Sequence, residues 1–355
     1  MEEKNKTSWI FAGVTSLVLA VVSVVILWYS IDVLLLFFAG ILLAILLRSI
    51  SIFFSHQLGL PDAAALGLVL SLIVGSFIVF VITLIPTIDA QWGELGTQLA
   101  EAWNKLKQNF QSNTFFKPLF FITKDVEWAN LIPQSSNIFF NATNLFTSTL
   151  GIFVGFFAVF FIGIFLAGDP QTYKNGFLKL IPIKNRARID QILDEITVSL
   201  QWWLIGKFLS MALIGVLTAL GLWLLDIPLA VSLGLIAAVL TFIPNFGPIL
   251  SAIPAVLMGA AQSLEAAFYV ILLYAGIQIF ETYLITPVIQ QKTISLPPAL
   301  IIGAQILLTV LAGGLGLILA TPLIAVIIII VNRLYVEDVL HDNKNLRCTE
   351  RDFSI

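Results

Sequence analysis

Residues 227–264 read IPLAVSLGLIAAVLTFIPNFGPILSAIPAVLMGAAQSL, and none of these 38 side chains carries a charge. A single α-helix of that length would measure about 57 Å at 1.5 Å per residue, whereas the hydrocarbon core of a bilayer is about 30 Å thick. The segment FIPNFGP at positions 242–248 interrupts the run, and Pro254 follows it. Proline in a helix interior removes a hydrogen-bond donor and clashes with the preceding turn. The run therefore predicts apolar helices joined by a break.

The composition of the whole chain places it in a membrane. Hydrophobic residues make up 59% of the 355 residues, charged residues make up 11%, and the mean hydropathy is +1.00. Soluble domains carry about 25% charged residues, so a soluble globule of this length could not hide so much apolar surface. The net charge of -3 and the lack of a basic face disfavour nucleic-acid binding.

Other stretches with few charges locate the remaining membrane spans, each of which needs about 20 apolar residues. A turn at Asp32 separates the first two, and the last stretch is again too long for one span and contains Pro297 and Gly313. Besides the broken run, the predicted spans cover residues 7–31, 33–54, 61–86, 145–167, 202–225, 266–287 and 294–332. We therefore predict an all-α, polytopic transmembrane helical bundle with about eight spans and with broken or re-entrant helices in its C-terminal half.

Charged and amphipathic segments divide the chain into regions. Residues 1–86 are the predicted N-terminal transmembrane helices. Residues 87–140 regain charge and carry apolar residues at helical spacing, which predicts a helical arm outside the hydrocarbon. Residues 141–335 are the predicted core domain, which includes an amphipathic helix at 185–201 that leads directly into the fifth span. Residues 336–355 form a polar tail.

Lysine and arginine residues gather on one side of the predicted bundle. They precede the first span and follow the second, the fourth and the last, with the largest cluster at 174–188. The positive-inside rule puts that side in the cytoplasm. We therefore expect both termini and the 185–201 helix to be cytoplasmic and the 87–140 arm to be extracytoplasmic.

One carboxylate lies inside a predicted span. Glu281 has Gln278 one turn earlier on the same helix face and Thr282 beside it. Ionisable residues at membrane depth are costly and mark ion or substrate pathways. The alternative is a structural carboxyl that hydrogen-bonds to the broken segments of its own protein, and the sequence leaves both interpretations open. Lys207 and Asp226 lie nearer to span ends and predict snorkelling towards the interface.

The break at 242–248 is the second candidate site. Backbone groups released around Asn245 and Gly247 could hold a polar ligand or a cation, and the alternative is a tight turn between two antiparallel spans. Gln305 and Thr309 share a helix face and could line the same cavity or pack between helices. The candidate pathway residues are Glu281, Gln278, Thr282, Asn245, Gly247 and Gln305, and the predicted helix breaks are Pro244, Pro248, Pro287 and Pro297.

Several classes of chemistry are disfavoured. No Gly-x-x-x-x-Gly-Lys-Ser/Thr loop occurs, so we do not expect ATP hydrolysis by this chain. The two histidines, His56 and His341, lie near predicted span ends, and the one cysteine is Cys348. We therefore expect no metal site, no cofactor and no catalytic triad, and we do not expect an enzyme.

From about residue 165 to 330, the order and spacing of several motifs are similar to those of the autoinducer-2 exporter family, also called the PerM-like family. The matching pieces are Gly168-Asp169-Pro170, Leu180-Ile181-Pro182, the helix with Arg186 and Arg188, residues 215–222, 242–248 and 278–281, Pro287, Pro297, and 316–323. The resemblance implies a bacterial inner-membrane protein that forms a homo-oligomer, with a pentamer as the expected state, and that exports small molecules.

Three functions are compatible with these patterns. The leading hypothesis is a permease that exports a small polar metabolite without ATP, with the quorum-sensing signal autoinducer-2 as the candidate substrate. The second is a sodium/proton antiporter that uses Glu281, although such antiporters usually carry several intramembrane acids. The third is an oligomeric membrane scaffold or an intramembrane enzyme, which the sequence disfavours because no nucleophile–base pair is visible.

Overall fold

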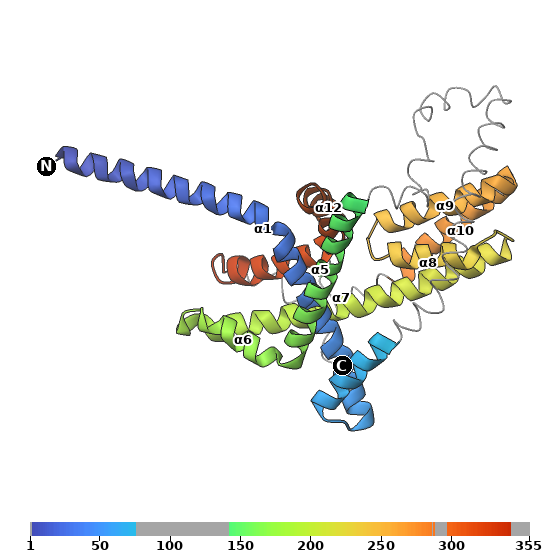
Figure 1. The fold of residues 1–355 in the computed structure, drawn as a ribbon, viewed down its shortest axis with the longest axis horizontal. Helices are drawn as coiled ribbons and strands as arrows, with labels where there is room; N and C mark the ends of the chain where they lie inside the picture. Colours follow the sequence, from blue (N-terminus) through green and yellow to red (C-terminus); the bar gives the residue numbers. More distant parts are fainter. Residues whose placement is uncertain (1, 76–141, 286, 288–296, 342–355) are drawn as a thin grey trace.

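The computed structural model describes residues 2–75, 142–285, 287 and 297–341, and within these residues the chain forms helices and turns without a β-strand (Figure 1). The predicted 87–140 arm lies outside the described residues. The helices are α1 (Glu2–Leu58), the helix Asp62–Gly75, α5 (Ala142–Gly168), α6 (Pro170–Lys179), α7 (Ile183–Leu224), α8 (Ala230–Leu240), α9 (Phe246–Gln262), α10 (Leu264–Phe280) with the π-helix η1 (Glu281–Ile285), and α12 (Pro298–Ile330) with the π-helix η2 (Val331–Glu337).

Four of the described helices are long and apolar enough to cross a membrane, and the number rises to five if α5 and α6 form one bent span. The four candidate spans are Ser30–Leu58, Ile183–Leu224, Leu264–Leu284 and Pro298–Glu337. Many large apolar side chains on these helices are exposed, as expected where lipid replaces water as the surrounding solvent. The prediction of an all-α, multi-pass membrane bundle is confirmed.

Helix α1 differs from the prediction at Asp32. The sequence analysis places a turn there between two spans, but the helix continues through Asp32 to Leu58. A single aspartate does not end a helix that has strong apolar helix formers on both sides, and no proline occurs before Pro61. The first half of α1 extends away from the other described helices, and the second half packs against α5 (Figure 1).

Glycines allow α1 and α5 to approach each other closely. A Cβ atom at Gly40 would lie 2.4 Å from Cγ2 of Ile162, and one at Gly163 would lie 2.7 Å from Cδ2 of Leu43. Small residues at helix–helix contacts are typical of membrane bundles, where dispersion contacts drive association. The exposed side of α5 carries phenylalanines, among them Phe156, whose ring stacks on that of the half-buried Phe160 with centroids 6.1 Å apart.

Helix α5 ends at Gly168, one residue after the predicted end of the 145–167 span, and the chain then turns through 90° into α6. Asp169 caps α6, since its carboxylate accepts a hydrogen bond of 3.1 Å from the backbone N–H of Thr172. Helix α7 follows without interruption from Ile183 to Leu224, so the predicted amphipathic helix and the predicted fifth span are one helix. At 42 residues, α7 measures about 63 Å.

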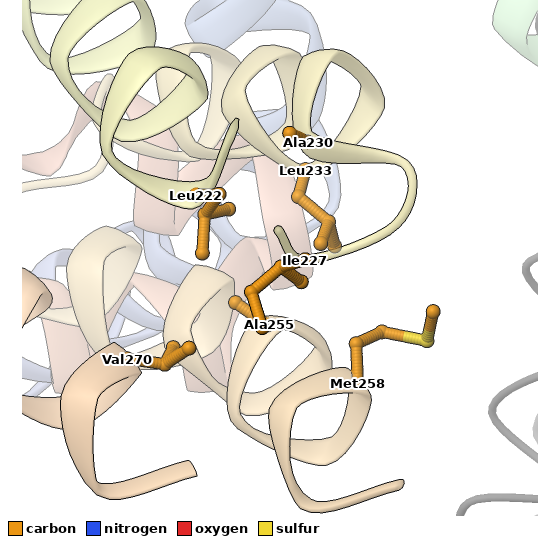
Figure 2. Packing of buried hydrophobic residues seen from close by; sticks show 7 residues of the cluster. All are labelled: Leu222, Ile227, Ala230, Leu233, Ala255, Met258 and Val270. Atoms are coloured by element: carbon orange, nitrogen blue, oxygen red, sulfur yellow. The ribbon is translucent and has the colours of Figure 1, made fainter. Parts of the chain in front are cut away.

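Helices α7 to α10 enclose the core cluster drawn in Figure 2, whose members are Leu222, Ile227, Ala230, Leu233, Ala255, Met258 and Val270. Leu233 and Ala255 are equally far along the chain from Pro244, which is the pattern of two antiparallel helices that turn at that proline. Helices α8 and α9 therefore form a hairpin. Their lengths, about 17 and 26 Å at 1.5 Å per residue, are shorter than the hydrocarbon thickness of about 30 Å, which is the geometry of a re-entrant element.

Both overlong apolar stretches are broken, as predicted. Residues 241–245 separate α8 from α9, and Asn245 adopts a φ of 67°. Helix α12 contains a sharp bend at Ala312 and Gly313, where Gly313 has a φ of 58° and a ψ of -138° that suit glycine. Behind the bend, a Cβ atom at Gly316 would lie 2.0 Å from the carbonyl oxygen of Leu308. The chain therefore turns back on itself at this point.

The prolines act differently from one another. Pro244 lies in the break, and Pro297 precedes α12 as its N-terminal cap, so both end or begin helices as predicted. Pro248 instead lies in the first turn of α9, where a missing N–H leaves no hydrogen bond unmade, and Pro254 lies inside α9. The predicted break at Pro248 is therefore wrong, and α9 continues through Pro254 as well. Pro287 follows η1, and its neighbours lie outside the described residues.

The hairpin depends on the absence of a side chain at Gly247. A Cβ atom there would lie 2.0 Å from the carbonyl oxygen of Leu240, which is backbone and cannot rotate away. We expect Gly247→Ala to lower the stability of the purified protein by about 1–3 kcal/mol, the usual cost of overpacking, measured as a lower thermal unfolding midpoint in detergent.

Gly276→Ala is the matched control, because Gly276 lies in α10 with no other atom within 4 Å of the added Cβ. Alanine is the better helix former, so this variant should be as stable as the unmodified protein or more so. Equal unfolding midpoints for the two variants would contradict the close approach of α9 to the end of α8.

Candidate functional site

The break between α8 and α9 is an ordered turn. The hydroxyl of Thr241 donates to the carbonyl oxygen of Ala237 at 2.6 Å and ends α8. The backbone N–H of Phe246 donates to the carbonyl oxygen of Pro244 at 2.8 Å, and the N–H of Gly247 donates to that of Ile243 at 2.9 Å. The turn therefore has a fixed shape, with the Asn245 side chain exposed and Gly247 buried.

Gln305 joins the two broken segments. Its side chain is fully buried on the first arm of α12, and its amide nitrogen Nε2 donates to the carbonyl oxygen of Pro244 at 3.0 Å. The amide oxygen Oε1 has no hydrogen-bond partner among the described residues. A buried polar atom left unpaired costs about 1–3 kcal/mol, so a group that donates a hydrogen bond to Oε1 would recover that free energy. The hydroxyl of Thr309 donates back to the Gln305 carbonyl, one turn before the bend.

Helix α7 runs beside this break. The rings of Trp203 and Phe242 meet edge to face with centroids 5.9 Å apart. Lys207 lies one turn after Trp203 on the same face of α7, and its ammonium interacts electrostatically with the carboxylate of Glu281. Lys207 is predicted to snorkel towards the interface, and its ammonium also lies within electrostatic range of Glu281. One stretch of α7 therefore contacts the break and lies within electrostatic range of this carboxylate.

Glu281 begins the π-helix η1 at the end of α10. Its carboxylate accepts a hydrogen bond of 3.3 Å from Nε2 of Gln278, as their spacing predicts, and the side chain of Thr282 is exposed. Short π-helical turns are frequent at functional sites because their backbone hydrogen bonds are rearranged. Glu281 therefore combines a change of helix geometry with a charged partner on α7.

The candidate residues thus fall into two groups linked by α7. Gln305 contacts the break directly, and Gln278 contacts Glu281. Trp203 and Lys207 connect the groups, and neither is among the pathway residues taken from the sequence. The spacing of Trp203 and Lys207 was visible in the sequence, but their partners lie about 40 and 75 residues further along the chain.

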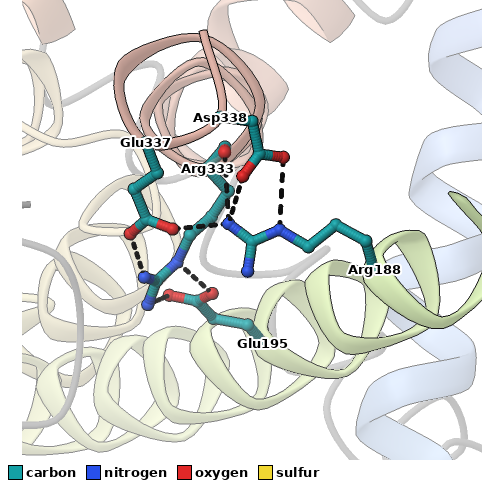
Figure 3. Close-up of polar contacts among 5 residues, drawn as sticks. All are labelled: Arg188, Glu195, Arg333, Glu337 and Asp338. Atoms are coloured by element: carbon teal, nitrogen blue, oxygen red, sulfur yellow. Dashed lines mark hydrogen bonds and ion pairs between the residues drawn. The ribbon is translucent and has the colours of Figure 1, made fainter. Parts of the chain in front are cut away.

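An ion-pair network that the sequence did not predict fastens α12 to α7 (Figure 3). Arg333 donates to both carboxylate oxygens of Glu195 at 2.7 and 2.9 Å, and it also pairs with Glu337. Arg188 pairs with Glu337 at 2.5 Å and with Asp338 at 3.0 Å. Bidentate arginine–carboxylate contacts add geometric specificity. The network, which we call the arginine clamp, therefore fixes the far end of α12 to the amphipathic half of α7.

The described residues contain no group of three or more histidine, cysteine, aspartate or glutamate side chains that could hold a metal ion. The site is instead built from amides, backbone carbonyls and one lysine–glutamate pair. Such groups bind and orient a polar molecule or an ion.

Sequence comparison identifies the family. A model of the AI-2E family transporters matches residues 17–335 of this chain. The chain belongs to the AI-2E transporter family. The match covers both broken segments and Glu281, and of the arginine clamp it covers Arg188, Glu195 and Arg333.

Three curated relatives carry names that refer to transport. The chain is 30% identical over 167 residues to "Putative transport protein YrrI" of Bacillus subtilis, covering 47% of each chain. It is 28% identical over 196 residues to "Putative transport protein YueF" of the same bacterium, covering 55% of this chain and 53% of the relative. It is 26% identical over 264 residues to "Putative transport protein sll0060" of Synechocystis, covering 74% and 70%. The alignments thus span about half the length of the first two relatives.

The electrostatic link between α7 and η1 can be measured with a double-mutant cycle. We expect Lys207→Gln and Glu281→Gln each to lower the thermal stability, because each leaves the other charge without its opposite. The double variant should lose less stability than the two single variants together, with a coupling of about 0.5–3 kcal/mol.

Glu265→Gln provides the matched cycle, since Glu265 lies on the same helix about 24 Å from Glu281. Its effect should add to that of Lys207→Gln. Additive effects in the Lys207–Glu281 cycle as well would show that the two charges do not interact.

Proposed function

We propose that this protein is a membrane permease that moves a small polar metabolite without ATP hydrolysis, and that autoinducer-2 is its substrate. Membership of the AI-2E transporter family and the names of the three relatives support transport. The choice of autoinducer-2 rests on the sequence resemblance to its exporters. The chain has no phosphate-binding loop of the Gly-x-x-x-x-Gly-Lys type, which supports transport without ATP.

One observation carries the proposal: Gln305 binds the carbonyl group of Pro244 and so joins two interrupted apolar helices. Irregular backbone at membrane depth is tolerated where it is buried in protein or lines a cavity. Transporters place their substrates at such interruptions, because released backbone groups and helix ends bind polar atoms there. The unpaired Oε1 atom of Gln305 supplies an acceptor for a hydroxyl or amine group.

This arrangement also gives a mechanism for movement. The hairpin of α8 and α9 and the bent helix α12 are separate elements. The hydrogen bond from the Gln305 amide to the Pro244 carbonyl joins them. A substrate that donates to Oε1 changes the balance of hydrogen bonds at this junction. Separation of the two elements would then open the site to one side of the membrane at a time, as in alternating access.

We expect Gln305→Leu to reduce efflux of autoinducer-2 from reconstituted vesicles about two- to tenfold. Leucine keeps most of the volume but removes the hydrogen bond that joins α12 to the break, while the Pro244 carbonyl keeps the N–H of Phe246 as a donor. One such hydrogen bond contributes about 0.5–1.5 kcal/mol. The measurement is the loss of trapped autoinducer-2 over time, with protein-free vesicles as the blank.

Gln262→Leu is the matched control. Gln262 also donates from Nε2 to a backbone carbonyl, that of Asp226 at 2.9 Å, but it lies at the other end of α9. Its efflux should stay close to that of the unmodified protein. Normal efflux by a well-assembled Gln305→Leu protein would remove this junction from the transport pathway.

Coupling to sodium or protons is a second candidate function, favoured by the Lys207–Glu281 pair. A carboxylate in a low-dielectric site, with a lysine in electrostatic range, can take up a proton or cation when the balance of local charges changes. We expect Glu281→Gln to abolish the part of the flux that an imposed proton or sodium gradient drives, while assembly in detergent stays intact.

Glutamine keeps the shape and most hydrogen bonds of glutamate, so if Glu281 is purely structural the variant should lose some thermal stability but keep its response to the gradient. Glu265→Gln, also on α10, should leave the gradient response unchanged. Equal flux of the unmodified protein with and without a gradient would exclude coupling, and it would leave the permease function standing.

We also propose that the protein is a homo-oligomer, with five copies as the expected number, in the inner membrane of a bacterium. The distribution of lysine and arginine supports cytoplasmic termini and an extracytoplasmic 87–140 arm. The exposed phenylalanine face of α5 offers an apolar surface for lipid or for a second copy.

A further inference from the structure

The corner between α6 and α7 exposes an apolar surface next to positive charge. Helix α6 has no buried residue. Tyr173, Phe177 and Leu180 follow at spacings of four and three residues, so they share one helix face, and they are 48%, 49% and 81% exposed. Ile183, at the start of α7, is also 81% exposed. We call residues 173–184 the α6 corner.

A neighbouring side of α6 is bound to the protein. The ammonium of Lys174 pairs with Asp190 at 2.7 Å and with Asp194 at 2.6 Å, both on α7. Helix α6 is therefore held in place by one face and leaves the aromatic and aliphatic face open. An amphipathic helix of this kind is typical of attachment to a membrane interface.

The corner itself is rigid. The guanidinium of Arg186 donates to the carbonyl oxygens of Ile181 at 3.0 Å and Lys179 at 3.2 Å, which are released at the end of α6. Arg186 thereby caps α6 and fixes the turn into α7. Leu180 and Ile183 are exposed on a built turn and not on a loose end.

The charge around this surface is positive. Residues 171–185 contain three lysines and no acidic residue, and one of the three, Lys174, is already paired. Lys179 and Lys184 are exposed and flank Leu180 and Ile183 in the sequence. Basic residues near an anionic leaflet are attracted to its phosphate groups, and each contributes measurably to binding.

The direction of α6 suits the same partner. It leaves α5 at 90°, so α6 runs parallel to the membrane surface when α5 crosses the bilayer along its normal. The apolar face then meets the boundary between headgroups and acyl chains, where aromatic side chains are favoured.

We propose that the α6 corner is a binding site for anionic phospholipid headgroups. Tyr173, Phe177, Leu180 and Ile183 enter the interface, and Lys179 and Lys184 contact the phosphate groups. This site is independent of the proposed substrate pathway, because it uses none of the residues around Gln305 or Glu281.

The test is photocrosslinking of the full-length protein in vesicles. Photoactivatable phosphatidylglycerol and photoactivatable phosphatidylcholine are compared, and the yield is measured on the peptide that contains residues 171–185. We expect phosphatidylglycerol to label this peptide severalfold more strongly than phosphatidylcholine at low salt. Lys179→Gln combined with Lys184→Gln should remove that preference, so that the two lipids label the peptide about equally.

Lys179→Arg combined with Lys184→Arg is the matched control and should retain the preference, since the charge is kept. Leu180→Ser combined with Ile183→Ser should lower the labelling by both lipids equally. The proposal is overturned if the unmodified protein labels equally with both lipids or if the glutamine variant keeps the preference. It is also overturned if excess inorganic phosphate removes the labelling, since the site would then bind a soluble anion.

Discussion

The backbone carbonyl of Pro244 is the constraint on which the central arrangement depends. At a helix break, carbonyl groups lose their partners within the helix, and a bilayer offers no water to replace them. In this protein the Pro244 carbonyl accepts from the N–H of Phe246 within the turn and from the amide of Gln305 on another broken helix. The hydrogen bond fixes where α12 lies relative to the hairpin of α8 and α9. It also explains why a fully buried glutamine occurs in such an apolar segment.

Polar contacts elsewhere divide the bundle into a closely packed interior and a charged end. Glycines bring α1 to α5 and α8 to α9, where dispersion contacts suffice. The charged residues gather where α7 is amphipathic, and there the arginine clamp holds η2. Ion pairs at this end are half-exposed and are individually weak, but several of them share the same arginines and act as one network. Close van der Waals packing therefore holds the apolar helices together, and ion pairs hold the charged end of α7 to η2.

Much of the architecture could be predicted from the sequence, because hydrophobic length and helix breakers act locally. The break before Asn245, the bend near Gly313 and the stop at Asp169 all follow from proline and glycine chemistry. The turn at Asp32 was wrong because one charge does not end a helix. The break at Pro248 was wrong because proline is tolerated in a first helical turn.

The site was predicted only in part, because its contacts join distant segments. Gln305 and Glu281 stood out as polar residues in apolar stretches, and the pairing of Gln278 with Glu281 followed from their spacing. The roles of Lys207 and Trp203 depend on how α7 crosses η1 and the break, which no local pattern contains. The pairing of Arg188 with Glu337 could not be predicted for the same reason, since the two residues are about 150 positions apart in the sequence.

Helix α7 is continuous over about 63 Å, and along this length it contacts α6, the arginine clamp, the break and η1. A continuous helix transmits tilt: a rotation of about 5° about its middle shifts each end by about 3 Å, in opposite directions. A displacement of α7 where it meets α6 would therefore also move the part of α7 that contacts the break.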